Sequence, residues 1–143
     1  MNKLPLIPAA TVLVLRDTKD GIEVLMVKRS KRPPFENLFV FPGGKIDEAD
    51  RNVNIYNLCN GLDDKEASIK LGISHAGLSY WVACIRECFE EVGILFAKKN
   101  NGEDLDLTGS EKEKYDEYRG NLIKNKITNG KIHKRTNRRS IKL

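Results

Sequence analysis

Residues 86–94 read Arg-Glu-Cys-Phe-Glu-Glu-Val-Gly-Ile, and this stretch decides how the rest of the chain is interpreted. Glu87, Glu90 and Glu91 stand at positions i, i+3 and i+4, which share one face of an α-helix. Like charges at this spacing repel one another, so a helix that keeps them needs a cation nearby. Arg86 is one candidate, and a hard divalent metal ion, which prefers carboxylate oxygens, is the other. A solvated acidic helix face is the simpler alternative.

The opposite side of this helix is apolar. Apolar residues recur there at steps of three and four, as in a helix that packs on a core, at Leu78, Val82, Ile85, Phe89, Val92 and Phe96. At about 100° per residue the three glutamates fall away from this stripe, toward solvent or a cleft. Gly93 indicates either the end of the helix or the close approach of another backbone. Trp81, Cys84 and Cys88 are expected to be packing residues.

A second segment lies upstream, where residues 39–47 read Phe-Val-Phe-Pro-Gly-Gly-Lys-Ile-Asp. A short apolar run that stops at Pro-Gly-Gly predicts a strand ending in a tight turn, whose backbone can come close to a ligand. On its own this pattern also fits an ordinary turn after a strand. Its occurrence before the acidic helix favours a functional site.

Together the two segments resemble the two halves of the Nudix box, Gly-x5-Glu-x7-Arg-Glu-apolar-x-Glu-Glu-x-Gly-apolar. Gly44 matches the first glycine, and residues 86–94 match the second half. Asp50 stands where the family has Glu, and 35 residues separate it from Arg86 where the pattern has seven, an insertion of 28. A long loop at this point is similar to one branch of the family, the peroxisomal acyl-coenzyme A diphosphatases. Arg29 and the serine after it match only the beginning of a further coenzyme A signature.

The resemblance implies a metal-dependent hydrolase that uses Mg²⁺ or Mn²⁺. The implied catalytic residues are Glu87, Glu90, Glu91 and Arg86. The implied metal ligands are the same three glutamates and the backbone carbonyl of Gly44. One of these glutamates, or a residue from a missing downstream part, would be the general base. Arg86 would orient the carboxylates through a salt bridge to Glu90. Candidate substrate-contacting residues are Arg29, Gly43 and Asp50. The implied reaction splits a phosphoric anhydride in coenzyme A or acyl-coenzyme A, giving 3′,5′-ADP and a phosphopantetheine.

The expected fold class is α+β, an α/β/α sandwich with a mixed sheet between helices. Residues 9–15 are predicted to form a buried strand, and residues 23–28 a second strand joined to it in a hairpin by a turn at 17–21. Residues 39–41 are predicted as a third short strand. Residues 1–98 would form the N-terminal part of a Nudix domain, with an insertion at about 51–79.

Within the insertion, Asp63 and Glu66 have the spacing of a capping box, and Gly72 predicts the end of a short helix at Leu71. His75 has no partner at a ligand or catalytic spacing. Two alternatives are open for the insertion as a whole. It either shapes the substrate pocket or forms a solvent-exposed excursion.

The composition changes after residue 98. Residues 99–120 are expected to form a charged loop and a helix that runs over 111–123, and no alternating strand pattern follows Phe96. Residues 121–143 hold eight Lys or Arg and no acidic residue, whereas the first 120 residues hold 17 basic and 20 acidic residues. A basic tail of this kind can bind nucleic acid, but without interleaved aromatic residues a disordered, solvated tail is favoured. The chain is therefore expected to be incomplete at its C-terminus, as the front part of a longer enzyme.

The sequence also bears on compartment and partners. Three cysteines without CxxC spacing favour a reducing environment, and no apolar run reaches the length of a membrane span. A soluble intracellular protein is expected, in the peroxisome by family resemblance, with cytoplasm and mitochondrion as alternatives. The last three residues, Ile-Lys-Leu, resemble the Ser-Lys-Leu peroxisomal address except at the first position. A small nucleotide substrate is the expected partner. A catalytically inactive nucleotide- or metal-binding remnant and an RNA-cap or RNA-binding protein remain as alternatives.

Overall fold

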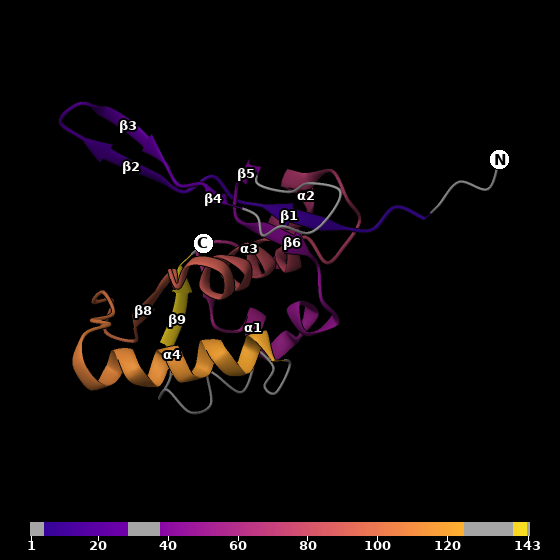
Figure 1. The fold of residues 1–143 in the computed structure, drawn as a ribbon. Helices are drawn as coiled ribbons and strands as arrows, with labels where there is room; N and C mark the ends of the chain where they lie inside the picture. Colours follow the sequence, from indigo (N-terminus) through magenta and orange to yellow (C-terminus); the bar gives the residue numbers. More distant parts are fainter. Residues whose placement is uncertain (1–4, 29–37, 125–138, 143) are drawn as a thin grey trace.

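The computed structural model describes residues 5–28, 38–124 and 139–142. Its central element is a long helix, α3, around which the other elements are arranged (Figure 1). In chain order the elements are β1 (Ala9–Thr11), β2 (Leu15–Thr18), β3 (Gly21–Val24), β4 (Val27–Lys28), β5 (Phe39–Val40), β6 (Gly43–Lys45), the 3₁₀ turn η1 (Glu48–Arg51), α1 (Val53–Tyr56), β7 (Cys59–Asn60), α2 (Asp64–Leu71), α3 (Leu78–Val92), β8 (Ala97–Lys99), α4 (Gly109–Ile123) and β9 (Arg139–Lys142).

The strands of the described residues pair in several small sheets. β1 pairs with β6, β2 with β3, and β4 with β5, each antiparallel. β9 lies between β7, to which it is parallel, and β8, to which it is antiparallel. The predicted α+β class with mixed strand pairing is confirmed.

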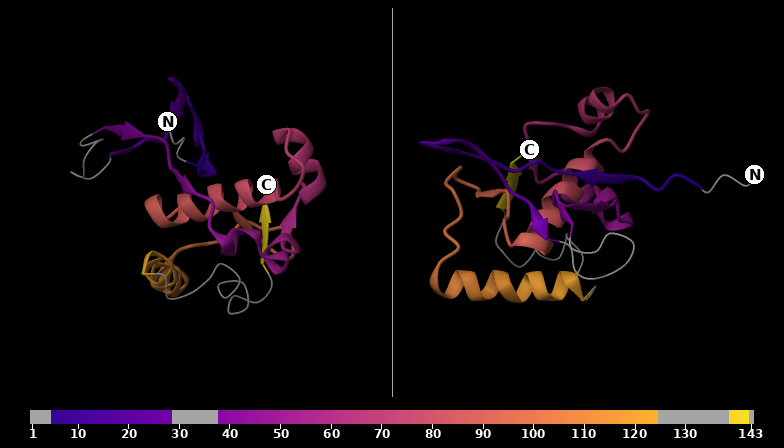
Figure 2. Two further views of the ribbon diagram at one scale, coloured as in Figure 1. Left: turned by 90° about the vertical axis from the view of Figure 1, so that its right-hand side faces the viewer. Right: turned by 45° about the horizontal axis from the view of Figure 1, so that its top comes forward.

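The N-terminal hairpin is also confirmed, but its strands differ from the predicted ones. β2 and β3 form an exposed ribbon that extends away from the helices (Figures 1 and 2). The predicted buried strand over residues 9–15 is wrong, because β1 ends at Thr11, and Leu13 and Leu15 are more than half exposed. Within the described part of the chain β1 pairs with β6 alone, and Ala10 is its one buried residue. The apolar bulk of residues 12–15 instead faces a pocket described below.

The apolar stripe of α3 packs on two clusters. Val82 and Ile85 contact Ile55 of α1, with Leu95 and Phe96 at the edge of this cluster. The second cluster joins α3 to α4 through Phe89, Tyr115, Tyr118 and Leu122. Tyr115 stacks edge-to-face on Phe89 at 6.3 Å and on Tyr118 at 5.9 Å between ring centroids, a favoured aromatic geometry. These contacts fix the orientation of α3, and hence the direction in which its polar face points.

The short helix predicted inside the insertion is present as α2. Asp63 and Glu66 form the capping box, and the helix ends at Leu71 before Gly72. The Asp64 carboxylate accepts hydrogen bonds from the amides of Ala76 at 3.1 Å and Leu78 at 2.9 Å, at the start of α3. Together with the pairing of β7 with β9, these contacts make the insertion an integral part of the fold rather than a solvent-exposed excursion.

The region after Phe96 contains more structure than the sequence suggests. The predicted helix over 111–123 is present as α4, two residues longer at its start, and the predicted tail boundary at residue 121 falls inside it. The expectation of no strand after Phe96 is wrong, because β8 and β9 pair with each other. β8 is only three residues long and has no alternating apolar pattern, so its signal was absent from the sequence. The disorder predicted for residues 121–143 is wrong at the two described ends, because residues 121–123 belong to α4 and residues 139–142 form β9, whereas residues 125–138 and 143 lie outside the described residues. Among the described helices none is long and apolar enough to cross a membrane.

Candidate active site

The carboxylates of α3 face the backbone of β6. An ideal Cβ built on Gly44 would lie 2.3 Å from Oε1 of Glu87, so a side chain at this position would displace the carboxylate. The amide of Gly43 donates a hydrogen bond to Oε2 of Glu91 at 3.3 Å. The predicted tight turn at Gly43 and Gly44 is wrong, because both residues lie in β6 and neither has a positive φ. The predicted close approach of this backbone is right, and it brings β6 against the acidic face of α3.

Arg86 is the centre of the site, and its side chain is only 6% exposed. Its Nε and Nη2 donate to the two carboxylate oxygens of Asp50, each at 2.9 Å, and Nη2 also donates to the carbonyl of Lys45 at 2.9 Å. Its Nη1 donates to Oε1 of Glu87 at 2.7 Å and to Oε2 of Glu90 at 3.4 Å. A forked, bidentate pair such as that with Asp50 fixes the plane of the guanidinium. The predicted salt bridge to Glu90 therefore exists, but it is longer than the contacts with Asp50 and Glu87.

Asp50 is the buried partner of Arg86. Its side chain is 0% exposed, and Oδ2 also accepts a hydrogen bond from the amide of Asp47 at 2.8 Å. The residue ahead of the insertion thus connects η1 to α3 across 36 positions of sequence. Its observed contacts hold Arg86 in place, whereas a direct contact with substrate remains a prediction.

The charges of the site shift the pKa values of Arg86 and Glu90. Burial acts to lower the pKa of Arg86, but the carboxylates of Asp50 and Glu87 outweigh burial and raise it above its usual range. Burial raises the pKa of Glu90, helped by the charges of Glu87 and Asp47 and opposed by Arg86. The single positive charge of Arg86 is therefore smaller than the summed negative charge of the carboxylates that contact it. The raised pKa of Glu90 means that its ionisation is disfavoured.

The donor set has the chemistry of a site for a hard cation. The carboxylates of Glu87, Glu90 and Glu91 and the nearby backbone oxygens are the ligands that Mg²⁺ and Mn²⁺ prefer. Within the described ranges, no group of three or more His, Cys, Asp or Glu side chains converges closely enough to hold a metal ion. Glu87 and Glu90 point toward Arg86 Nη1, and Glu91 toward the amide of Gly43. The residues fit such a cation in kind and in charge, and their side chains would have to turn toward it.

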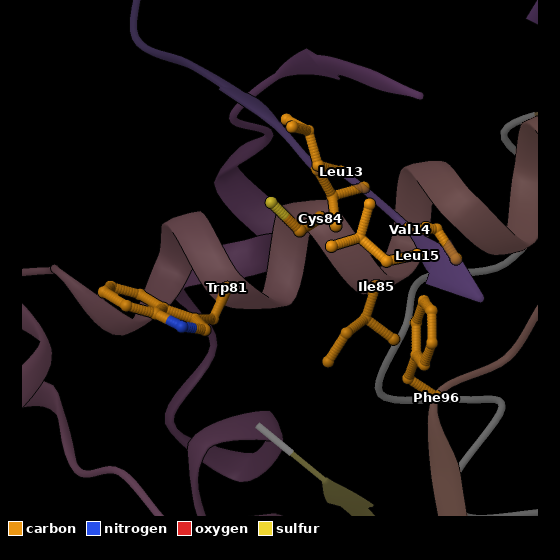
Figure 3. Close-up of a pocket in the computed structure, with 8 residues that line it drawn as sticks. Leu13, Val14, Leu15, Trp81, Cys84, Ile85 and Phe96 are labelled. Carbon is orange, nitrogen blue, oxygen red and sulfur yellow. The ribbon is translucent and has the colours of Figure 1, made fainter. Parts of the chain in front are cut away.

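An apolar pocket of about 280 Å³ lies beside α3 (Figure 3). Its lining residues come from the segment between β1 and β2, from α3 and from the segment after α3, and are Val12, Leu13, Val14, Leu15, Trp81, Cys84, Ile85 and Phe96. Burial raises the pKa of the Cys84 thiol, and so do the charges of Glu87 and Asp50. Cys84 lines the pocket and precedes Glu87 by three residues on the same helix. Of the three residues expected to pack, Cys88 is buried, whereas Trp81 and Cys84 line this pocket.

Three further residues complete the comparison with the sequence-based expectations. Arg29 lies outside the described residues. His75 is exposed, and its Nδ1 lies 2.8 Å from the hydroxyl of Ser74. Arg119 of α4 was missed: it donates to the backbone carbonyls of Glu90 and Glu91. In the sequence Arg119 is one of many charges on a helix, and nothing in its spacing distinguishes it.

The chain is similar to known proteins over most of its length. A family model described as the NUDIX domain matches residues 5–128. An acyl-coenzyme A diphosphatase of Xenopus laevis is 29% identical over 130 residues, which cover 72% of this chain and 34% of that protein. The chain therefore spans about a third of the length of this relative.

A solved structure supports the same assignment. The crystal structure of a NUDIX hydrolase from Alicyclobacillus acidocaldarius has the same fold, with a TM-score of 0.68 and 23% sequence identity. The match covers 97% of this chain and 58% of that one. Because the family model matches most of the chain, and Gly44 and residues 86–94 match the pattern of the Nudix box, the chain belongs to the NUDIX domain family.

Proposed function

We propose that this chain hydrolyses a phosphoric anhydride bond in a nucleoside diphosphate derivative, with Mg²⁺ or Mn²⁺ as cofactor. One observation carries the proposal. Glu87, Glu90 and Glu91 lie on one face of α3 against the backbone of β6, around a buried arginine that cannot balance them. Such a cluster attracts a divalent cation, and a diphosphate needs cations to offset its own charge.

The cation would be held by Glu87, Glu90, Glu91 and the carbonyl of Gly44. When bound, it would supply charge neutralisation on the diphosphate and acidification of the attacking water. Arg86 would fix the directions of Glu87 and Glu90. Glu90 is proposed as the general base, because its contact with Arg86 at 3.4 Å is longer than that of Glu87 at 2.7 Å, which leaves its carboxylate freer to accept a proton from the attacking water.

Coenzyme A or an acyl-coenzyme A is the proposed substrate. Water would attack the anhydride, the phosphorus–oxygen bond would break, and the products would be 3′,5′-ADP and a phosphopantetheine. The similarity to an acyl-coenzyme A diphosphatase supports this choice, as does the insertion between Asp50 and Arg86. The apolar pocket beside Cys84 supports an acyl-coenzyme A as well, because its hydrocarbon acyl chain is apolar.

The test is a turnover assay on the purified chain with Mg²⁺ or Mn²⁺ and with EDTA. Its substrate panel is coenzyme A, an acyl-coenzyme A, NADH, ADP-ribose and capped RNA. The proposal expects metal-dependent release of 3′,5′-ADP from the coenzyme A compounds. Turnover of capped RNA alone would contradict the substrate, and metal binding without any turnover would favour an inactive remnant.

Peroxisomal localisation is proposed on the resemblance to the branch of the family with a split Nudix box. Co-localisation of an N-terminally fluorescent fusion with a peroxisomal marker is the expected result. A diffuse cytoplasmic signal would contradict it.

A further inference from the structure

The end of α3 that carries Glu90 and Glu91 is held by a residue from another helix. Arg119 of α4 donates from Nε to the carbonyl of Glu90 at 2.9 Å and from Nη2 to the carbonyl of Glu91 at 3.0 Å. The helix ends at Val92, and Gly93 follows with a φ of 75°, a left-handed conformation that favours glycine.

Arg119 compensates two electrostatic features of this helix end. The last four carbonyls of an α-helix have no amide partner within the helix, and the helix dipole makes that end negative. Glu90 and Glu91 add negative charge at the same end, and the last turn of α3 contains no basic residue. The guanidinium of Arg119 supplies both the missing donors and the missing positive charge.

Arg119 is itself held in place by the core. Its neighbour in sequence, Tyr118, is buried against α3 together with Tyr115 and Leu122, in a cluster that includes Phe89. The backbone of α4 at Arg119 is therefore fixed relative to the last turn of α3. The interaction joins two packed helices, and it differs in this respect from an exposed ion pair between flexible side chains.

From these contacts we infer that Arg119 is a positioning residue for Glu90 and Glu91. It keeps the last turn of α3 wound, so that the two carboxylates project from adjacent positions toward the same side. Since the role of Arg119 requires that Glu90 and Glu91 bind the same metal ion, this inference rests on the proposed function. Loss of Arg119 would let this turn fray and would separate the two ligands without removing either.

The other end of α3 offers a matched control. Asp64 holds the first turn through the amides of Ala76 and Leu78, as Arg119 holds the last. Leu78 lies twelve positions before Glu90, a distance of about 18 Å along a helix. Asp64→Ala thus loosens the same helix far from the carboxylates, which separates general destabilisation from local positioning.

The experiment measures Mn²⁺ binding to the full chain by electron paramagnetic resonance, without substrate. We expect Arg119→Gln to weaken binding about 10-fold, the lower range for loss of a residue that supports metal ligands. The Mn²⁺ affinity of Arg119→Lys should lie between those of wild type and Arg119→Gln, since a single ammonium group cannot reproduce the planar fork of the guanidinium. Asp64→Ala should bind like wild type. Hydrogen exchange should show faster exchange at the amides of residues 90–93 in Arg119→Gln only.

The outcomes separate this inference from the proposed function. If wild type binds Mn²⁺ and Arg119→Gln binds it equally well, the positioning role is overturned while the proposed function stands. An equal loss of affinity in Asp64→Ala would also overturn it, since it would show a general effect of destabilising α3. If wild type neither binds Mn²⁺ nor hydrolyses any substrate, the proposed function itself has failed.

Discussion

Removal of the Asp50 carboxylate should destabilise this protein more than most single substitutions. In Asp50→Ala the guanidinium of Arg86 stays buried but loses two hydrogen bonds of 2.9 Å and its only fully buried counter-charge among the described residues. Breaking a buried ion pair from one side costs about 3–5 kcal/mol. Because small domains have total stabilities of about 5–15 kcal/mol, a large part of the free energy of unfolding would be lost.

The assay is urea unfolding followed by the fluorescence of Trp81, the only tryptophan in the chain. For a slope of about 2 kcal/mol per molar urea, the expected loss lowers the unfolding midpoint by about 1.5–2.5 M. Glu23→Ala is the control, because it breaks an exposed ion pair with Arg16. The Glu23 side chain is 53% exposed and the Arg16 side chain 77%. Exposed pairs contribute at most about 1 kcal/mol, so the control midpoint should barely move.

A second variant tests the geometry of the same pair. Asp50→Glu restores the residue of the family pattern, but it adds a methylene at a position that is 0% exposed. Overpacking of a buried site costs about 1–3 kcal/mol, so this variant should be more stable than Asp50→Ala and less stable than wild type. If Asp50→Ala shifts the midpoint no more than Glu23→Ala does, the reasoning about the buried pair is refuted.

Two other predictions concern the packing of the site and its surroundings. Gly44→Ala should displace the Glu87 carboxylate, which would lie 2.3 Å from the new Cβ, and so weaken Mn²⁺ binding in a titration. Gly120→Ala is the matched control, because its new Cβ would meet no atom within 4 Å, and it should leave Mn²⁺ binding unchanged. Equal binding by both variants would disprove the close approach of β6 to α3. Burial raises the pKa of the Cys59 thiol to about 11, two units above its ordinary value of 9.0, so its thiolate is scarce at pH 8. Alkylation of Cys59 by iodoacetamide is followed by peptide mass spectrometry, and its rate at pH 8 should be about 100-fold lower than that of a free thiol. The alkylation rate should still rise with pH at pH 10. A rate that reaches a plateau by pH 9 would contradict the raised pKa.

The sequence predicted best what depends on neighbouring residues. The capping box of α2 and its end at Leu71 were predictable, because each signal lies within a few residues of its effect. The acidic face of α3 was predictable from helical periodicity in the same way. Local chemistry and a regular period were sufficient for these elements.

Long-range contacts were not predictable from the same signals. The bidentate pairing of Arg86 with Asp50 joins residues 36 positions apart, and the spacing around Arg86 pointed to Glu90 instead. Gly43 and Gly44 indicated a turn by composition, whereas pairing with β1 draws them into a strand. Arg119 could not be identified, because its role depends on how α4 packs on α3 through Tyr115 and Tyr118.

The carboxylates of α3 are proposed to form a metal-dependent site for anhydride hydrolysis. The most direct test of this site is the rate of 3′,5′-ADP release from an acyl-coenzyme A with Mn²⁺, in wild type and in Glu90→Gln. Glu113→Gln, on the exposed face of α4, is the control for loss of a carboxylate. We predict that Glu90→Gln lowers kcat at least about 100-fold, as expected for loss of a general base, while Glu113→Gln retains the wild-type rate. Equal rates in wild type and Glu90→Gln would contradict the account.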